Sequence, residues 1–227
     1  MLPSPGKNYG LADSADRGKV MIAVIELIAE VKPRGFVLEN VANLARQHRS
    51  VLKEILSLIK AAGYKVYFRI LDTKHFGLPQ SRPRLYIVGQ RVDAVKSRFT
   101  WPPLQAEATN IDDFLLPDDL VSPGIRTKGL SSLGQWHLEK AGDEMEKKKH
   151  ISTFTKTCCI DVSAGKSRHH VTVGYSPCIT KSRGATGGYY LTTKLRMMDL
   201  KEICALQGFP THAWDIEEHI LRKPTYK

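Results

Sequence analysis

Residues 35–71 read GFVLENVANLARQHRSVLKEILSLIKAAGYKVYFRIL, and this stretch decides the fold class. Residues 35–38 form a short apolar run without alternation, which is typical of a strand buried on both faces of a parallel sheet. A helix follows, with Ser50 as the expected N-cap and Gly63 as the expected left-handed C-cap. Residues 64–71 are rich in aromatic and β-branched side chains and indicate a second strand.

The flanking segments continue this alternation of helix and strand. Residues 19–31 place apolar side chains at helical spacing, and Pro33 ends that pattern. Residues 84–90 favour another strand, after a loop that contains Gly77 and Pro79. The order helix, strand, helix, strand predicts an α/β layered sheet, in which ligands lie beyond the carboxyl ends of the strands.

The charge of the chain changes sign in its second half. The 227 residues include 34 Lys and Arg against 23 Asp and Glu, which gives a net charge of +11. Residues 104–146 carry nine acidic and three basic side chains, whereas residues 147–196 carry ten basic and one acidic. We therefore expect a separate small lobe with a basic surface, and because such a surface attracts polyanions, nucleic acid is the first partner to consider.

The cysteines and the hydropathy exclude several classes of protein. Four cysteines are too few for a disulfide scaffold in a chain of this length. Cys158-Cys159 and His169-His170 are adjacent pairs whose side chains diverge on extended backbone, so no metal site is predicted. No apolar run approaches the ~18 residues that span a bilayer, and the N-terminus lacks a secretory pattern. An intracellular protein without a membrane segment is expected.

Three clusters carry the chemical information. The first is Phe36-Val37-Leu38-Glu39-Asn40-Val41, a hydrophobic strand that leads into Glu-Asn-Val. The second, residues 76–84, reads FGLPQSRPR, and the third runs from Arg196-Met197-Met198 through Glu202 to the LQGFP of residues 206–210. In this order and at these spacings, the clusters resemble the sixth, eighth and ninth motifs of the cytosine-5 DNA methyltransferase family.

The resemblance implies an α/β fold, namely an incomplete Rossmann-like fold of S-adenosylmethionine-dependent methyltransferases with a small target-recognition lobe. On this basis, residues 1–100 are expected to form part of the catalytic domain. Residues 101–195 would form the recognition lobe and its linker, and residues 196–227 would return to the catalytic domain.

The resemblance also implies the activity of a DNA (cytosine-5-)-methyltransferase. Carbon 5 of cytosine is a poor nucleophile, so the family adds a thiolate to carbon 6 and thereby makes an enamine that attacks the methyl group of S-adenosylmethionine. Glu39 is expected to share a proton with ring nitrogen 3, which a dry pocket would favour. Arg82 or Arg84 is expected to stabilise the charge that develops at oxygen 2.

A lobe that holds DNA is needed because the target base must leave the duplex before carbon 6 can be attacked. Basic side chains of residues 147–196 could neutralise phosphates of double-stranded DNA. The expected DNA-binding residues are Gln80, Lys181, Arg183, Thr192, Thr193 and Arg196. The residues expected to have structural roles in the motifs are Asn40, Gln207 and Gly208.

Three elements of the family are missing from this sequence. They are the Pro-Cys nucleophile, the Phe-x-Gly-x-Gly loop that binds the cofactor, and the family's last motif around a Gly-Asn-Ala/Ser-Val turn, which is expected after Pro210. Residues 6–18 resemble the stretch just downstream of the nucleophile, which would then precede Met1; in another alignment Gly6 takes the place of the cysteine. Pro177-Cys178 imitates the catalytic dipeptide but lies far downstream of Glu39, so we interpret it as unrelated.

The chain is therefore predicted to be a fragment or subunit that is inactive alone, with a complementary chain as a partner that supplies the cysteine and the cofactor site. Two alternatives remain open: a catalytically dead DNA-binding homologue, and an RNA cytosine-5 methyltransferase. The expected location is the nucleus in a eukaryote, and the cytoplasm or nucleoid in a bacterium.

Overall fold

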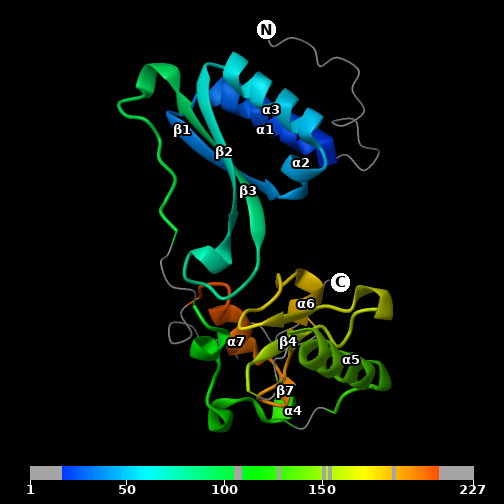
Figure 1. Cartoon of the computed structure of the whole chain (residues 1–227). Helices are drawn as coiled ribbons and strands as arrows, with labels where there is room; N and C mark the ends of the chain where they lie inside the picture. Colours follow the sequence, from blue (N-terminus) through cyan, green and yellow to red (C-terminus); the bar gives the residue numbers. More distant parts are fainter. Residues whose placement is uncertain are drawn as a thin grey trace, which may run out of the picture. The chain divides into compact units, whose positions relative to one another are not determined.

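The computed structural model describes residues 17–104, 109–126, 129–149, 152, 155–185 and 188–209, which form two compact units. Unit 1 contains residues 17–72 and 83–103, and unit 2 contains residues 73–82 and the described residues from 104 onward. The connection between two strands of unit 1 therefore belongs to unit 2 (Figure 1). Each unit has a hydrophobic core of its own.

Unit 1 is a three-stranded sheet with helices on one face (Figure 1). Its strands are β1 (Gly35–Val41), β2 (Tyr64–Asp72) and β3 (Pro83–Arg91), in the order β1-β3-β2. Because β3 runs antiparallel to both neighbours, β1 and β2 point in the same direction. Its helices are α1 (Arg17–Val31), α2 (Asn43–Arg46), α3 (Arg49–Ala61) and the 3-10 turn η2 (Val92–Ala94). The predicted alternation of helix and strand is confirmed.

Helix α3 packs an apolar face against the sheet. The side chains that it buries are Leu52, Ile55 and Ile59, and burying each contributes about 1.5–3 kcal/mol. The helix begins at Arg49 with His48 as its N-cap, so the predicted cap at Ser50 is wrong, because Ser50 already lies inside the first turn. Gly63 follows the helix with a φ of +92°, as expected for a left-handed C-cap.

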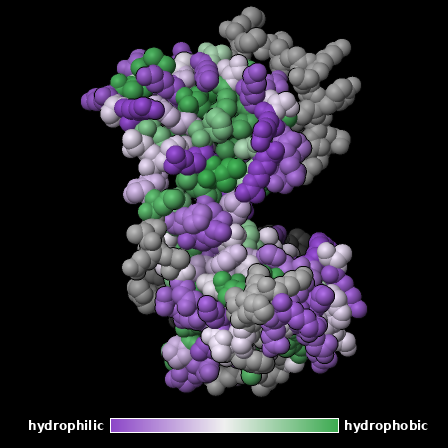
Figure 2. Space-filling view, in the orientation of Figure 1, coloured by the Kyte–Doolittle hydropathy of each residue, from purple (hydrophilic) through white to green (hydrophobic). Residues whose placement is uncertain are grey.

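Strand β1 buries one face, and the prediction of a strand buried on both faces of a parallel sheet is wrong. Phe36 and Leu38 pack on the core with α1 and α3, whereas Val37 and Val41 are 64% and 54% exposed. Among the described residues β1 pairs only with β3, in antiparallel register. Hydrophobic side chains consequently gather on the surface of unit 1 (Figure 2).

Aromatic residues after β3 cover part of the second face of the sheet. The ring centroid of Tyr67 on β2 lies 5.4 Å from that of Phe99, which lies 4.9 Å from that of Trp101. The guanidinium of Arg69 lies 5.6 Å from the centroid of Trp101. Since Tyr67 and Arg69 alternate with core residues of β2, this cluster packs on the face opposite α1 and α3.

Unit 2 is built on a four-stranded antiparallel sheet in the order β5-β4-β6-β7. Its strands are short: β4 (Cys158–Ile160), β5 (Val171–Val173), β6 (Tyr190–Leu191) and β7 (Arg196–Met197). Its helices are α4 (Pro123–Arg126), α5 (Ser132–Lys149), α6 (Lys181–Ala185) and α7 (Leu200–Ala205). Its 3-10 turns are η1 (Thr73–His75), η3 (Ile111–Phe114), η4 (Asp118–Leu120) and η5 (Lys166–Arg168).

Alternation along these strands divides the interior of unit 2 into two clusters. Cys159 and Leu191 contribute to one cluster, together with Ile203 and Leu206 of the α7 region. The other cluster contains Ile160, Tyr190 and Met197, with Ala141 of α5. Because neighbouring residues of a strand point to opposite faces, both sides of the sheet are packed.

The observed units differ from the predicted domains at two places. The predicted boundary near residue 100 lies close to the observed one, which follows Pro103. Residues 73–82, however, belong to unit 2, and so does α7, which was expected to return to the catalytic domain. Residues 210–227 lie outside the described part of the chain.

A test of the unit 1 core follows from the register of β1 and β3. Phe36 lies directly opposite Gly89, and a Cβ at position 89 would come within 2.2 Å of its ring. Gly89→Ala should lower the free energy of unfolding by about 1–3 kcal/mol, because the ring must leave its place beside Tyr64. Thermal unfolding followed by circular dichroism measures the loss. Gly142→Ala in α5, where a Cβ meets nothing within 4 Å, is the control; an equal loss there would contradict the assignment.

Candidate active site and DNA-binding surface

The side chains of Glu39 and Arg84 form an ion pair on the sheet of unit 1. The register places Val41 opposite Arg84, so Glu39 on β1 is a diagonal neighbour of Arg84 on the same face. Arg84 Nε lies 2.8 Å from Glu39 Oε1, and the two side chains are 19% and 46% exposed, respectively. A pair this exposed contributes only about 0–1 kcal/mol to stability. A contribution to stability alone therefore does not explain the presence of the Glu39–Arg84 ion pair.

The surroundings fix both partners while leaving the pair accessible. Arg84 Nη1 donates to the carbonyl of Pro83 at 3.0 Å. At the end of β1 the side-chain oxygen of Asn40 accepts a 2.8 Å hydrogen bond from Val41 N, which gives Asn40 a local structural role. The dry pocket expected around Glu39 is not formed by the described residues of unit 1, since that side chain is half exposed.

Arg82, the other arginine of the second cluster, belongs to unit 2. Its Nη1 lies 3.5 Å from Cys178 Sγ. The chain thus passes from unit 2 to unit 1 between Arg82 and Pro83, where β3 begins. Of the three residues expected in the catalytic site, the structure brings Glu39 and Arg84 into contact and places Arg82 beside Cys178.

The cysteines all lie in unit 2. Cys158 and Cys159 are buried on β4. Burial raises the pKa of the Cys159 thiol and that of the Cys204 thiol, so both stay protonated near neutral pH. Because the thiolate is the reactive form, these two are poor nucleophiles.

Gln80, which was expected to bind DNA, is an interior residue of unit 2. Its Nε2 donates to the carbonyl of Leu206 at 2.8 Å, and its Oε1 accepts from Ile179 N at 3.4 Å. A parallel bridge with Ser176 holds the backbone beside it. Gln80 is 1% exposed, so in this conformation its role is internal, and a DNA contact stays a prediction.

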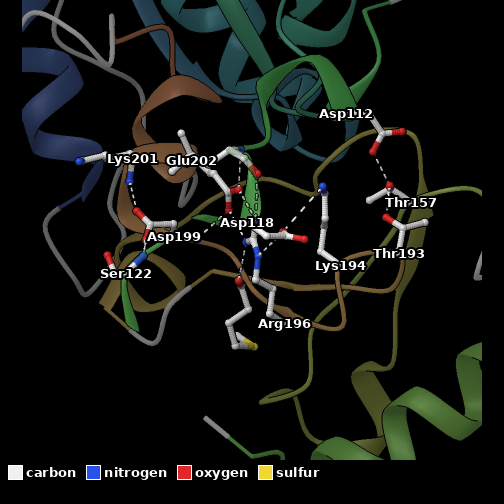
Figure 3. A network of polar contacts seen from close by, with 12 residues as sticks. Asp112, Asp118, Ser122, Thr157, Thr193, Lys194, Arg196, Asp199, Lys201 and Glu202 are labelled. Carbon is white, nitrogen blue, oxygen red and sulfur yellow. Dashed lines mark hydrogen bonds and ion pairs between the residues drawn. The ribbon is translucent and has the colours of Figure 1, made fainter. Parts of the chain in front are cut away.

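Arg196 is also buried, where it forms a bidentate ion pair with Glu202 (Figure 3). Its Nη2 and Nη1 lie 2.8 and 2.9 Å from the two carboxylate oxygens. Burial alone would lower the pKa of Arg196, but the hydrogen bonds and charge of Glu202 raise it, so the guanidinium stays charged. Glu202 also accepts the backbone N–H of Leu116 at 2.9 Å. Arg196, which was expected to bind DNA, therefore has an internal partner within unit 2.

Asp199 completes this network as the N-cap of α7 (Figure 3). Its carboxylate accepts from Lys201 N at 2.9 Å and from Ser122 N at 3.0 Å. Burial alone would raise the pKa of Asp199, but these N–H donors hold it below its ordinary value. Glu202 reaches back to Asp199 N at 2.7 Å, which completes a capping box.

Glu202 was not among the residues expected in the site, although the sequence contains a pattern that indicates its role. Asp199 and Glu202 have the spacing of a capping box before the apolar run of α7. Two other residues of the third cluster are placed by the same helix. Gln207 Nε2 donates to Ile203 O at 3.5 Å, and Gly208 takes a φ of +84° after the helix end, which suits the structural role expected of it.

The two threonines expected at the DNA are held by β4 and its neighbours. Thr192 is 1% exposed, and its Oγ1 accepts from Cys158 N at 3.0 Å, so its role in this conformation is internal. Thr193 is partly exposed, and its hydroxyl lies 2.6 Å from that of Thr157. A DNA contact by Thr193 stays a prediction.

Helix α6 carries the two remaining DNA-binding candidates. Lys181 is exposed at the start of the helix. Arg183 Nε lies 2.8 Å from Asp161 Oδ2, and its Nη1 donates to the hydroxyl of Ser163. Asp161 thus neutralises Arg183, whereas Lys181 presents its charge to solvent; a DNA contact remains a prediction for both.

The described residues contain no group of His, Cys, Asp and Glu arranged to hold a metal ion. In the same part of the chain no helix combines the length and apolar composition needed to cross a bilayer.

The buried ion pair generates a stability test. Arg196→Met should cost about 3–5 kcal/mol, because it leaves the Glu202 carboxylate buried without its counter-ion. Combining it with Glu202→Gln removes that charge, so the double variant should lose less than the sum of the two single losses. Urea unfolding of the four proteins gives the coupling free energy. A coupling free energy near zero would show that the contact contributes nothing.

Comparisons with known proteins were made for the sequence and for the fold. The profile of the family described as C-5 cytosine-specific DNA methylase matches residues 4–227. The type II methyltransferase M.HaeII of Haemophilus aegyptius is 28% identical over 219 residues, which are 90% of this chain and 58% of that protein. M.HhaI of Haemophilus parahaemolyticus is 26% identical over 214 residues, 90% of this chain and 61% of that protein.

Among solved structures, the Dnmt2 methyltransferase of S. pombe aligns with 88% of this chain and 63% of its own, at 15% identity and a TM-score of 0.45. The chain thus spans less than two thirds of the length of each of these relatives. The family profile, in contrast, covers nearly all of its 227 residues. The chain belongs to the C-5 cytosine-specific DNA methylase family.

Proposed function

We propose that this chain acts in the transfer of a methyl group from S-adenosylmethionine to carbon 5 of cytosine in double-stranded DNA. The observation that carries the proposal is the 2.8 Å contact between Arg84 Nε and Glu39 Oε1 on one face of β1 and β3. Membership of the family supplies the reaction class. The Glu39–Arg84 ion pair is partly exposed and contributes little to stability. Charged side chains held in this way are expected at a site that binds a ligand.

The chemistry of the two side chains matches one edge of a cytosine. Nitrogen 3 and oxygen 2 are adjacent acceptors on that edge, so a protonated carboxyl and a guanidinium held side by side can bind both. As a thiolate adds to carbon 6, electron density moves toward nitrogen 3 and oxygen 2. Glu39 would then give its proton to nitrogen 3, and the fixed charge of Arg84 would stabilise oxygen 2.

S-adenosylmethionine does not fit a cavity that the described residues of unit 1 form. That cavity, of about 590 Å³, lies beside α3 and Phe68 and is lined by the cations Arg49, Lys53 and Lys60. Three cations oppose binding of a sulfonium. We propose that another polypeptide segment supplies both the thiolate and the cofactor site, and that this segment belongs to the same protein or to a complementary chain.

Exposed apolar side chains support the proposal that further polypeptide packs on unit 1. They lie on α1 and on β1: Val20, Leu27, Val31, Val37 and Val41. Exposed apolar side chains mark interaction surfaces, and here they occur both on α1 and on the face of β1 that points away from α1. Because the proposed substrate is DNA, we place the protein inside the cell, where DNA is found.

Catalysis by Glu39 is tested in an enzyme completed with segments that carry the cysteine and cofactor motifs of a relative. Glu39→Gln keeps the shape and one hydrogen bond but cannot give a proton to nitrogen 3. The single-turnover rate should fall by about 10²–10⁴, while DNA affinity stays within a few-fold.

Glu30→Gln, which alters an exposed carboxylate on α1, is the matched control and should leave the rate unchanged. Melting temperature is measured on the same samples. If Glu39→Gln lowers the melting temperature and leaves the rate near normal, Glu39 is structural and the catalytic assignment is wrong.

DNA binding by unit 2 is tested with Lys181→Ala, measured by fluorescence anisotropy on labelled duplexes of several sequences. A lysine that contacts a phosphate contributes about 0.9 to the magnitude of the slope of log K against log salt. The affinity of Lys181→Ala for DNA should therefore fall equally for every sequence, and the magnitude of its salt slope should decrease by about one. Lys140→Ala, an exposed lysine on α5, is the control. Equal effects of the two substitutions would remove Lys181 from the DNA surface.

A further inference from the structure

A cavity of about 670 Å³ opens in unit 2 beside the ring of Tyr175. This volume lies within the roughly 300–1,000 Å³ of small-molecule sites. Residues from four separate segments of the chain line it: Lys74, His75, Thr109, Asn110, Asp112 and Lys156, with Tyr175 and its neighbours. The methyl-transfer chemistry proposed above uses none of these residues.

The lining of this cavity contains two ammonium groups and one carboxylate. Lys74 Nζ lies 5.2 Å from the centroid of the Tyr175 ring, so a cation–π contact holds the ammonium at the cavity wall. Lys156, which is exposed, supplies a second cation. Asp112 is the acidic residue of the lining, and its two oxygens accept hydrogen bonds from Thr157 Oγ1 and Asn110 Nδ2. An anion would therefore meet two ammonium groups and a carboxylate already occupied by donors.

The walls of the cavity are fixed by backbone hydrogen bonds. Gly174 N donates to Thr157 O, and Gly174 O accepts from Ile111 N, both at 2.9 Å. Thr157 is itself buried, and its hydroxyl also lies 2.6 Å from that of Thr193. These bonds join the segments around residues 111, 157 and 174, so a ligand would bind to a preformed site.

One polar atom in the lining lacks a partner. Thr109 Oγ1 is buried and makes no hydrogen bond within the described part of the chain. Leaving a buried hydroxyl unpaired costs about 1–3 kcal/mol, so such an atom calls for a ligand or an ordered water. The lining therefore contains a hydroxyl donor that no described acceptor uses.

We propose that this cavity is a phosphate-binding site, with Lys74 and Lys156 as its cations and Thr109 as a hydroxyl donor. The phosphate would belong to a DNA strand or to a free nucleotide. The inference rests on the proposed function for the DNA source, and it adds Lys74, which lies outside the basic stretch 147–196, to the nucleic-acid surface.

The experiment uses the 227-residue chain, Lys74→Ala, Lys156→Ala and, as control, Lys140→Ala. Binding of a labelled 20-base-pair duplex is followed by anisotropy between low and moderate salt. Each pocket substitution should weaken binding several-fold and lower the salt slope by about one, whereas the control should change neither. In parallel, the amide signal of Gly174 in nitrogen-15 NMR spectra is followed during titration with deoxycytidine monophosphate and with inorganic phosphate. Nucleotide or phosphate should move that signal in the parent and not in the two pocket variants.

The two arms separate this inference from the proposed function. If the parent binds duplex, both pocket variants keep its affinity and slope, and neither nucleotide nor phosphate moves the Gly174 signal, the phosphate site is refuted while DNA binding stands. If the parent does not bind duplex but nucleotide moves the Gly174 signal only when both lysines are present, the site stands and the DNA substrate fails. No duplex binding and no movement of the signal would overturn both.

Discussion

The buried carboxamide of Gln80 is the interaction on which the two-unit organisation of the chain depends. It reaches Leu206, 126 residues away in the sequence, and Ile179, 99 residues away. Losing one partner of such a buried amide costs about 1–3 kcal/mol. Residues 73–82 are thereby held in unit 2, although the strands on either side of them form unit 1. The two arginines of one short motif consequently belong to different units.

Unit 2 uses polar residues typical of DNA contacts for its own interior. Gln80, Thr192 and Arg196 are buried, and each has partners within the unit. Because these side chains bond to partners inside the unit, the positive charge that a polyanion could contact comes from exposed lysines such as Lys181 and Lys156. The buried side chains therefore form the hydrogen bonds and ion pairs inside unit 2, whereas the exposed lysines supply the positive charge at its surface.

Much of unit 1 could be predicted from the sequence, because its helices and strands have clear periodicity and Gly63 marks a left-handed residue. The exposed face of β1 could not be predicted. An apolar run without alternation has the same pattern whether its second face is covered by this chain, by other polypeptide or by solvent.

The candidate site was predictable only in part. Glu39 and Arg84 were found from their motifs, but their contact depends on the register of β1 with β3, which the sequence does not specify. The interior positions of Gln80 and Arg196 depend on packing between distant segments, which local patterns cannot indicate. The cavity at Tyr175 likewise gathers residues from four parts of the chain.

The assignment of residues 73–82 to unit 2 has a consequence for exchanging this unit between members of the family. Transplanting only the stretch that follows Pro103 would pair Gln80 of the recipient with a donor's counterparts of Ile179 and Leu206. A graft that respects the buried amide has to move two pieces together, with junctions after Asp72, Arg82 and Pro103. Sequence divergence in unit 2 is therefore constrained by ten residues, 73–82, that a linear domain map assigns to unit 1.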